Sequence, residues 1–150
     1  MVAKIESNKL DPAYSNVKKI ENALELLTKH YEKEAHEIMI KKIISVSKNE
    51  NIANMIKLIN KYAISQLPVL DNDKVIGLIS ETSILKSDLE DIKNLTAKDI
   101  MEEASPIIDK NARLEVIKQL LRFYPLVLVK EKGKLIGLIT KTDLINSLIY

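Results

Sequence analysis

Two polar residues near the C-terminus have the types and the spacing needed to hold a small ligand. Thr140 ends the apolar run LIGLIT, and Asp143 stands in the first turn of the helix expected to follow. An ionised aspartate only accepts hydrogen bonds, so Asp143 can accept two of them from a ribose diol. Free N–H groups at a helix start favour a nearby phosphate, and Thr140 adds a hydroxyl. The alternative is that Asp143 only stabilises its own helix.

The same segment occurs twice in the chain, and the two copies differ at the carboxylate. Residues 74–85 read KVIGLISETSIL, and residues 134–145 read KLIGLITKTDLI. An internal repeat sets the architecture, so it is considered before other patterns. Ser83 stands where the second copy has Asp143, and it lacks the charge for a charge-assisted contact with a ribose. The two copies should therefore bind a ligand unequally.

Each copy closes a longer unit whose predicted elements follow the order β-α-β-β-α. The first unit opens with the apolar stretch 43–46, followed by a helix with Asn49 as its N-cap and apolar residues at helical spacing, namely Ile52, Met55, Ile56 and Ile59. Strands at 66–70 and 75–80, a turn at 71–73 and a helix at 81–89 complete it. The second unit has the stretch 106–108, a helix capped by Asn111 with Leu114, Ile117, Leu120 and Leu121, strands at 126–129 and 135–140 around a turn at 131–133, and a helix at 141–148.

The hairpin strands are apolar without clean alternation, which predicts that both of their faces are buried. One three-stranded sheet with two helices exposes too much apolar surface to be stable alone, whereas two such units bury that surface against each other. We therefore expect an α+β fold with units at 35–90 and 91–150, packed face to face about a pseudo-twofold axis, and preceded by a helical segment at 1–34.

This arrangement resembles a tandem pair of CBS domains, the family named after cystathionine β-synthase. The matching segments are residues 38–39, 43–46 and 64–80 in the first unit, and residues 99–101, 106–108 and 126–145 in the second. The resemblance implies a non-catalytic regulatory module that binds adenine nucleotides or adenosyl compounds between the repeats, and that assembles as a homodimer of pairs. The implied regulatory ligands are AMP, ADP, ATP or S-adenosylmethionine, and no cofactor is required.

The same resemblance assigns further residues to the site that contains Thr140 and Asp143. Ser105 and Pro106 match the Thr-Pro step that lines the adenine pocket, and Ile107 and Ile139 would flank the base. Ser65 matches a position that reaches into the site of the partner repeat. These assignments place the ligand mainly on the second repeat, with one residue contributed by the first.

Two other residues of the second repeat, Lys141 and Tyr124, have two interpretations each. Lys141 and Lys130 are candidate phosphate contacts, and the alternative, which we favour for Lys141, is a solvated surface lysine. Phe123 and Tyr124 occupy the positions of Ile64 and Ser65 in this alignment. Tyr124 either stacks on a purine or fills a gap in an aliphatic core.

The first repeat departs from the family pattern in two places, which predicts a weaker or empty site there. Ser83 replaces the aspartate, and Lys41-Lys42 stand where a Thr-Pro step is expected. Such a site is either empty or recruits anions through these lysines. The second site is assigned to Lys42, Ile43, Ile64, Ser80 and Ser83.

The N-terminal residues 2–24 resemble the second half of a Cro/repressor-type helix-turn-helix, with the match concentrated at Ile5–Pro12 and in the helix after it. The two helices that come first in that family are missing, so either the chain is part of a longer DNA-binding regulator or the segment is a structural helix only. DNA is an expected partner only if a complete helix-turn-helix lies upstream. The apolar positions Val17, Ile20, Leu24, Leu27 and Tyr31 form a short heptad seam, which packs on the body or, as we favour, on its mate in a dimer.

Composition excludes several other functions. The chain of 150 residues has a net charge of +2, no cysteine and no basic stripe of the kind that non-specific nucleic-acid binding needs. No apolar run approaches the ~20 residues of a membrane helix, so we expect a cytoplasmic protein without membrane contact. His30 and His36, six positions apart, do not share a helix face, so neither a metal site nor an enzyme is expected. The predicted function is the nucleotide-sensing part of a transcription regulator, and the alternative is a dimerisation or scaffold module with degenerate sites.

Overall fold

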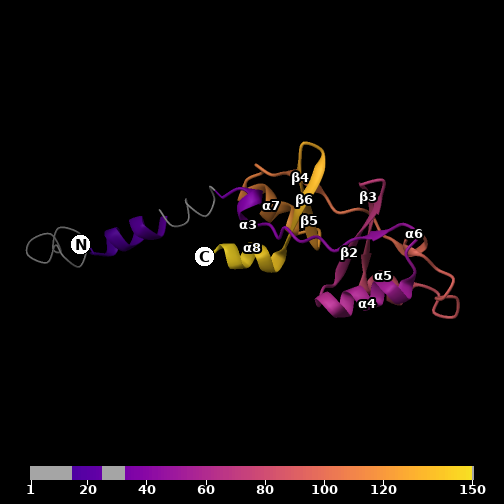
Figure 1. Cartoon of the computed structure of the whole chain (residues 1–150). Helices are drawn as coiled ribbons and strands as arrows, with labels where there is room; N and C mark the ends of the chain where they lie inside the picture. The colour runs from indigo at the N-terminus through magenta and orange to yellow at the C-terminus, as the bar shows by residue number, and fades with distance from the viewer. Residues whose placement is uncertain (1–14, 25–32, 150) are drawn as a thin grey trace, which may run out of the picture.

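Two three-stranded sheets, one from each half of the chain, form the framework of the protein (Figure 1). The computed structural model describes residues 15–24 and 33–149. The first half contains α3 (Ala35–Ile38), β1 (Val46–Ser47), α4 (Ile52–Tyr62), β2 (Gln66–Asp71), β3 (Lys74–Ser80) and α5 (Glu81–Lys86). The second contains α6 (Ala97–Ile100), β4 (Ile107–Asp109), α7 (Leu114–Leu121), β5 (Leu126–Glu131), β6 (Lys134–Thr140) and α8 (Lys141–Ser147).

Both sheets have the same topology and the same register. In each sheet the central strand pairs in parallel with the short first strand and antiparallel with the third. The β2–β3 and β5–β6 hairpins turn through residues with positive φ, at Asn72-Asp73 and Lys132-Gly133, as a two-residue turn of the I′ type requires. The register pairs Gln66 with Ser80 and Leu126 with Thr140, so both third strands end beside the start of a central strand.

Each sheet packs its own helix, and a third apolar cluster joins the two sheets. Helix α4 buries Ile52, Met55 and Ile59 against the first sheet, and α7 buries its apolar face against the second. Between the sheets lie Leu78 of β3 and Leu126 and Leu128 of β5. Complete burial of such a side chain contributes about 1.5–3 kcal/mol relative to exposure, so this contact stabilises the pair of repeats as one unit. The expected α+β pair of β-α-β-β-α repeats, packed face to face, is confirmed.

The segment that opens each repeat crosses over to the other repeat. Figure 1 shows α3 beside α7 and α8 of the second half, and α6 beside β3 of the first. Backbone bonds join Ile40 to Leu138 of β6, and Glu102 to Leu78 of β3, in both directions. A Cβ placed on Gly137 would lie 2.5 Å from Met39 Sδ and 2.9 Å from the Ile40 carbonyl oxygen. Only glycine lets the opening segment lie this close to β6. Gly77 of β3 allows the same close contact with Met101 in the other half.

Several element boundaries differ from the sequence-based expectation. Helix α4 is capped by Asn51, whose side chain accepts a hydrogen bond from the Asn54 N–H at 2.8 Å, and not by Asn49. The N-cap of α7 is Arg113, because Asn111 is held in the preceding turn by Asp109. The short helices α3 and α6 were not anticipated, since four residues show no periodicity.

The N-terminal expectation is only partly described by the structure. Residues 15–24 form a helix, and Val17 and Ile20 of the heptad seam are 52% and 60% exposed. The helix-turn-helix match at 5–12, as well as Leu27 and Tyr31, lies outside the described residues. The comparisons with known proteins described below give no support to the helix-turn-helix resemblance.

Candidate functional site

The start of α8 is a capping box built by Thr140 and Asp143. Asp143 Oδ2 accepts hydrogen bonds from the Thr140 backbone N–H and from the Thr140 hydroxyl, both at 2.8 Å. The Asp143 N–H donates back to the Thr140 hydroxyl oxygen at 3.4 Å. Among the described residues, Asp143 Oδ1 has no hydrogen-bond partner, and the side chain is half-buried. One carboxylate oxygen therefore holds the helix start and the other is available to a ligand.

The start of α5 has the same backbone arrangement with different side chains. Ser83 Oγ accepts from the Ser80 N–H at 2.8 Å and donates to the Ser80 carbonyl oxygen at 2.8 Å, while the Ser83 N–H donates to Ser80 Oγ at 3.0 Å. Ser83 is 4% exposed. Its hydroxyl is committed within its own helix start and hidden from solvent. The Ser80–Ser83 pair therefore retains the cap and leaves no charged acceptor for a ligand.

A third copy of the motif shows that Thr-x-x-Asp is not by itself a ligand site. Thr96 and Asp99 form the same box at the start of α6, with Asp99 Oδ2 accepting from the Thr96 N–H at 2.8 Å and from its hydroxyl at 3.0 Å. These hydrogen bonds hold the pKa of the Asp99 carboxyl below its usual value, because they favour the ionised form. Asp99 is exposed at the edge of the molecule, so its surroundings, and not the motif, distinguish Asp143.

Asp143 opens onto a cleft of 520 Å³ that both repeats line; we refer to it as the Asp143 cleft. Its volume falls in the range of about 300–1,000 Å³ that is usual for small-molecule pockets. The lining residues are Ile40, Lys42, Ile44, Tyr62, Ala63, Ile64, Ser65, Gln66, Leu126, Leu138, Thr140, Thr142 and Asp143. Apolar side chains supply the walls for a flat ring, and polar groups stand at two places, around Thr140 and around Lys42.

Lys42 and Tyr62 form the basic part of the cleft. Lys42 Nζ lies 4.9 Å from the centroid of the Tyr62 ring, and Lys61 Nζ lies 5.3 Å from it. Such a distance permits a cation–π contact. Among the described lining residues, Lys42 is the one lysine and Asp143 the one carboxylate. The cleft thus offers an acceptor and a cation to the same ligand.

The structure groups the predicted site residues differently from the sequence. Lys42 and Ile64, assigned to the weaker site, line the Asp143 cleft together with Ser65 and Thr140. The cause is the crossover, because the segment that opens the first repeat pairs with Leu138 of β6 at Ile40, two residues before Lys42. The Asp143 cleft therefore combines the opening segment of the first repeat with the closing helix of the second. An alignment of the two repeats cannot reveal this combination.

Pro106 and Tyr124 belong to the end of the two-repeat unit that lies opposite the Asp143 cleft. Strand β4 pairs with β5 as β1 pairs with β2, so Pro106 is equivalent to Ile44 and lies toward Ser80 and Ser83. The register also makes Tyr124 equivalent to Ile64, and Pro125 equivalent to Ser65, which corrects the expected alignment by one residue. We call this opposite end, defined by Ser80, Ser83 and Ala104, the Ser83 corner.

The remaining assignments do not place their side chains in the Asp143 cleft. Ile139 is fully buried in the core beneath the second sheet, because it points to the face opposite Leu138, which does line the cleft. Ile107 and Ile43 line other hollows, near the hairpin turns. Ser105 is 4% exposed, and its hydroxyl has no partner among the described residues. Lys141 is exposed and does not line the cleft.

Sequence reasoning missed several lining residues, of which Tyr62, Ile40 and Leu138 are the most informative. Tyr62 is the last residue of α4, and Ala63 follows with a φ of 51°, which turns the chain into the cleft. Its position after an amphipathic helix gave no functional signal. Leu138 was available from the sequence, since it alternates with Ile139, but a strand with two apolar faces does not show which face is turned to a ligand.

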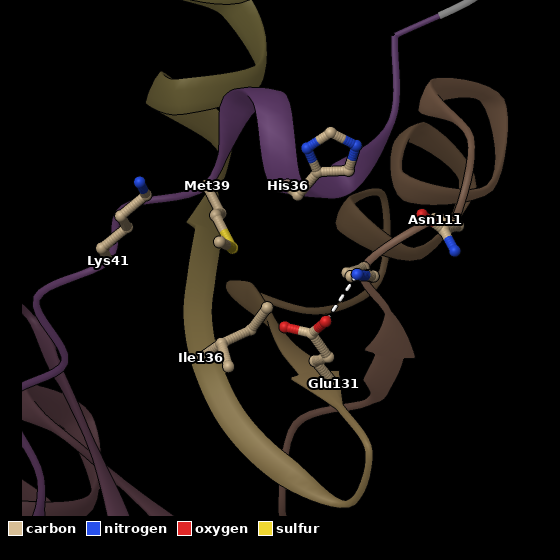
Figure 2. A pocket seen from close by; sticks show the side chains of 7 residues that line it. His36, Met39, Lys41, Asn111, Glu131 and Ile136 are labelled. Carbon is tan, nitrogen blue, oxygen red and sulfur yellow. Dashed lines mark hydrogen bonds and ion pairs between the residues drawn. The ribbon is translucent and has the colours of Figure 1, made fainter.

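A second hollow, of 390 Å³, lies between the segment that opens the first repeat and the sheet of the second repeat (Figure 2). Figure 2 shows His36 and Met39 on one side and Glu131 on the other, and the dashed line at Glu131 marks its ion pair with Lys110. This ion pair is 2.5 Å long and raises the pKa of Lys110. Lys48 and Asp71 form the equivalent pair in the first repeat, at 3.1 Å.

Residues 15–24 and 33–149, the described part of the chain, bring together no group of three or more His, Cys, Asp or Glu side chains that could hold a metal ion. None of its helices has the length and apolar character required to cross a membrane.

Comparisons with known proteins agree with the geometry. The sequence profile of the CBS domain matches residues 35–90 and 97–150. An inosine-5'-monophosphate dehydrogenase of Methanocaldococcus jannaschii is 31% identical over 121 residues, which are 79% of this chain and 24% of that protein. An uncharacterized protein of the same organism is 34% identical over 117 residues, which are 75% of this chain and 43% of that protein. The chain thus spans less than half the length of these relatives.

Among solved structures, the CBS domain of a bacterial CNNM/CorC family Mg²⁺ transporter in complex with ATP superposes with a TM-score of 0.75 at 21% identity. The superposition covers 87% of this chain and 97% of that one. At this identity the likeness establishes the fold, and the ATP belongs to that protein.

Proposed function

The chain belongs to the CBS domain family, and from this premise we propose that it is a regulatory module that binds one adenine nucleotide in the Asp143 cleft. The observation that carries the proposal is the half-buried Asp143 carboxylate, which lines a cleft of nucleotide size and holds its helix with Oδ2, while Oδ1 has no hydrogen-bond partner in the described part of the chain. A ribose diol can donate to that oxygen, and the hydrocarbon walls from Ile44, Ile64 and Leu138 suit an adenine ring.

The relatives support this proposal without fixing the ligand. A CBS domain of similar fold is known in complex with ATP, and the matched dehydrogenase corresponds to this chain over 24% of its length. A role in regulation, without catalysis by the repeats themselves, accounts for both findings. AMP, ADP, ATP and S-adenosylmethionine are the ligands to compare, since all four contain adenine and a ribose.

Calorimetric titration with these four compounds tests the proposal. We expect saturable binding of at least one compound, with one ligand per chain. Asp143→Asn should weaken binding about 10- to 100-fold, because a hydrogen bond to a charged group contributes about 1.5–3 kcal/mol. Asp99→Asn is the matched control, since Asp99 has the same capping role away from the cleft. Absence of binding at millimolar ligand would overturn the proposal and favour a scaffold module with degenerate sites.

We further propose that two chains associate, in part through the helix at 15–24. Val17 and Ile20 expose more than half of their surface on this helix, and a second copy of the chain could cover these apolar side chains. Light scattering should give the mass of a homodimer, and the double substitution Val17→Glu, Ile20→Glu should weaken association. A monomer at all concentrations would contradict this proposal.

The role as the sensor part of a transcription regulator is a separate proposal, supported only by the helix-turn-helix resemblance of residues 2–24. Its test is the genomic frame upstream of Met1. An in-frame pair of helices that completes the DNA-binding domain would support it, and a stop codon directly upstream of Met1 would remove it.

A further inference from the structure

We propose that Lys42 selects the phosphorylated end of the ligand, and that the Tyr62 ring holds its ammonium until a phosphate takes it. The inference rests on the proposed function, because it names the chemical class that the Asp143 cleft prefers. That class is a nucleoside phosphate, as opposed to a neutral nucleoside or a cationic adenosyl sulfonium. Asp143 contacts the ribose, and Lys42 contacts the phosphate of the same molecule.

The first support is the distribution of charge between the two ends of the pair. Lys42 and Asp143 come from different repeats, yet both line one cleft. The pairing of β1 with β2 and of β4 with β5 makes Ala104 the equivalent of Lys42, and Ser83 is the equivalent of Asp143. Neither of these two positions is charged at the Ser83 corner, where Arg122 takes the place of Tyr62. A cation and an acceptor that line the same cleft fit one ligand with two polar parts.

The second support is the position of the lysine itself. Lys42 is exposed, and its Nζ lies 4.9 Å from the Tyr62 centroid, with Lys61 Nζ at 5.3 Å from the same ring. A cation–π contact at an exposed site is weak, whereas a charge-assisted hydrogen bond to a phosphate oxygen is among the stronger contacts in proteins. A phosphate in the cleft can therefore draw Lys42 from the ring. Lys61 stays near Tyr62 and keeps the ring occupied.

The third support is the charge balance of the cleft. A neutral nucleoside would use the Asp143 carboxylate and leave the Lys42 ammonium without a hydrogen-bonded anion. A phosphate supplies that anion, and the charge of Lys61, whose Nζ lies 5.3 Å from the Tyr62 ring, offsets part of the added negative charge. An adenosyl sulfonium would instead bring a positive charge toward two lysines. The expected order of affinity is AMP or ADP, then adenosine, then S-adenosylmethionine.

The test compares AMP with adenosine on the full chain by calorimetry. The wild-type protein should bind AMP at least about tenfold more tightly than adenosine. Lys42→Met should lower AMP affinity about tenfold and leave adenosine affinity within about twofold, and Lys42→Arg should restore most of the loss. Lys57→Met, an exposed lysine of α4 outside the cleft, is the charge control and should change neither affinity.

Tyr62→Leu tests the holding role of the ring. With no ring to compete for the ammonium, the ratio of AMP to adenosine affinity should rise a few-fold, whatever the loss of base contact does to both ligands. A fall in that ratio would show that Tyr62 positions Lys42 for phosphate and would overturn the holding role.

The outcomes separate this inference from the proposed function. If neither AMP nor adenosine binds, the proposed function fails. If both bind equally tightly, and Lys42→Met changes neither or both by the same factor, the proposed function stands and the role of Lys42 is wrong. Asp143→Asn should weaken both ligands by a similar factor, since both contain the ribose. Circular dichroism of each variant checks that the substitution leaves the fold intact.

Discussion

At Ser80–Ser83 and at Thr140–Asp143 the chain builds the same helix start with different side chains. Ser83 uses its hydroxyl as both donor and acceptor and is buried, whereas Asp143 uses one oxygen and leaves the other at a cleft. The backbone demand, a partner for the N-cap N–H, is met in both. The comparison shows that the fold requires a capping residue at this position and does not require a carboxylate, so the additional oxygen of Asp143 is free to serve a ligand.

The largest loss of stability is expected at Gly77 and Gly137, the two equivalent glycines over which the opening segments cross. Gly77→Ala and Gly137→Ala each place a Cβ 2.5 Å from a methionine sulfur and within about 3 Å of a carbonyl oxygen. Each should lower the free energy of unfolding by about 1–3 kcal/mol through overpacking. Urea denaturation measures this, and Gly133→Ala separates the two causes, because its Cβ meets nothing within 4 Å and any loss there comes from its positive φ of 77° and not from overpacking. Equal losses at the two sites support the crossover, and a loss at only one would contradict its symmetry.

Exchanging the two capping residues should have opposite consequences. Asp143→Ser keeps a capping hydroxyl, so we expect nearly unchanged stability and about tenfold weaker nucleotide binding. Ser83→Asp buries a carboxylate at a site that is 4% exposed and should destabilise the protein by about 1–3 kcal/mol. Thermal unfolding and calorimetry of the same two variants check this. If Ser83→Asp bound a second ligand at the Ser83 corner, which has Ala104 in place of Lys42, a lysine at that position would not be required for nucleotide binding.

Removing the N-cap hydroxyl should cost a similar amount in both repeats. Thr140→Ala and Ser80→Ala each remove a hydroxyl that accepts a hydrogen bond from the N–H of the residue three positions later. Loss of an N-cap costs about 1 kcal/mol. The N–H of residue 140 or 80 keeps its side-chain acceptor in both variants, but the hydrogen bond that is lost is 3.4 Å long at Thr140 and 3.0 Å long at Ser80, so the loss at Thr140 should be the smaller of the two. Chemical denaturation resolves the difference, and the reverse order would contradict the capping geometry.

The smallest effect concerns the third box, at Thr96. The pKa of the Asp99 carboxyl lies below its ordinary 3.8 because the Thr96 N–H and hydroxyl donate to it. Its contribution to stability is therefore present above the unfolded-state pKa and is lost as the pH falls through the lower folded-state pKa. Wild type should exceed Asp99→Asn in stability near pH 6, and the difference should shrink in acid below pH 3.8. A constant difference across this range would rule out the pKa shift.

Much of the fold follows from local patterns. The apolar spacing of Ile52, Met55 and Ile59 places α4 on its sheet, and the repeated hairpins turn where Asn72-Asp73 and Lys132-Gly133 permit positive φ. Sequence repetition alone identified the pair. The boundaries were less predictable, because N-caps are chosen among several polar residues: Asn51 caps α4 although Asn49 stands two positions earlier.

Membership of the site depended on contacts between distant segments. The side chains of Thr140 and Asp143 were identifiable because their spacing brings both to one helix start. Ile139 was misplaced, since a strand buried on both faces has no pattern that distinguishes the core side from the ligand side. Lys42 was assigned to the other site, whereas the structure brings it to the Asp143 cleft, because Ile40 is hydrogen-bonded to Leu138 of β6, almost a hundred residues away in the chain.

The amino-acid sequence by itself determined that there are two equivalent repeats, that each ends in a capped helix, and that only one cap has a carboxylate. These are local properties, set by residue type and short spacing. Tertiary structure decided which residues share a cleft with that carboxylate. The reason is physical: each repeat leaves an apolar sheet face that the other must cover, and covering it carries the opening segment of one repeat onto the closing strand of the other. Lys42 and Asp143 meet only through that exchange.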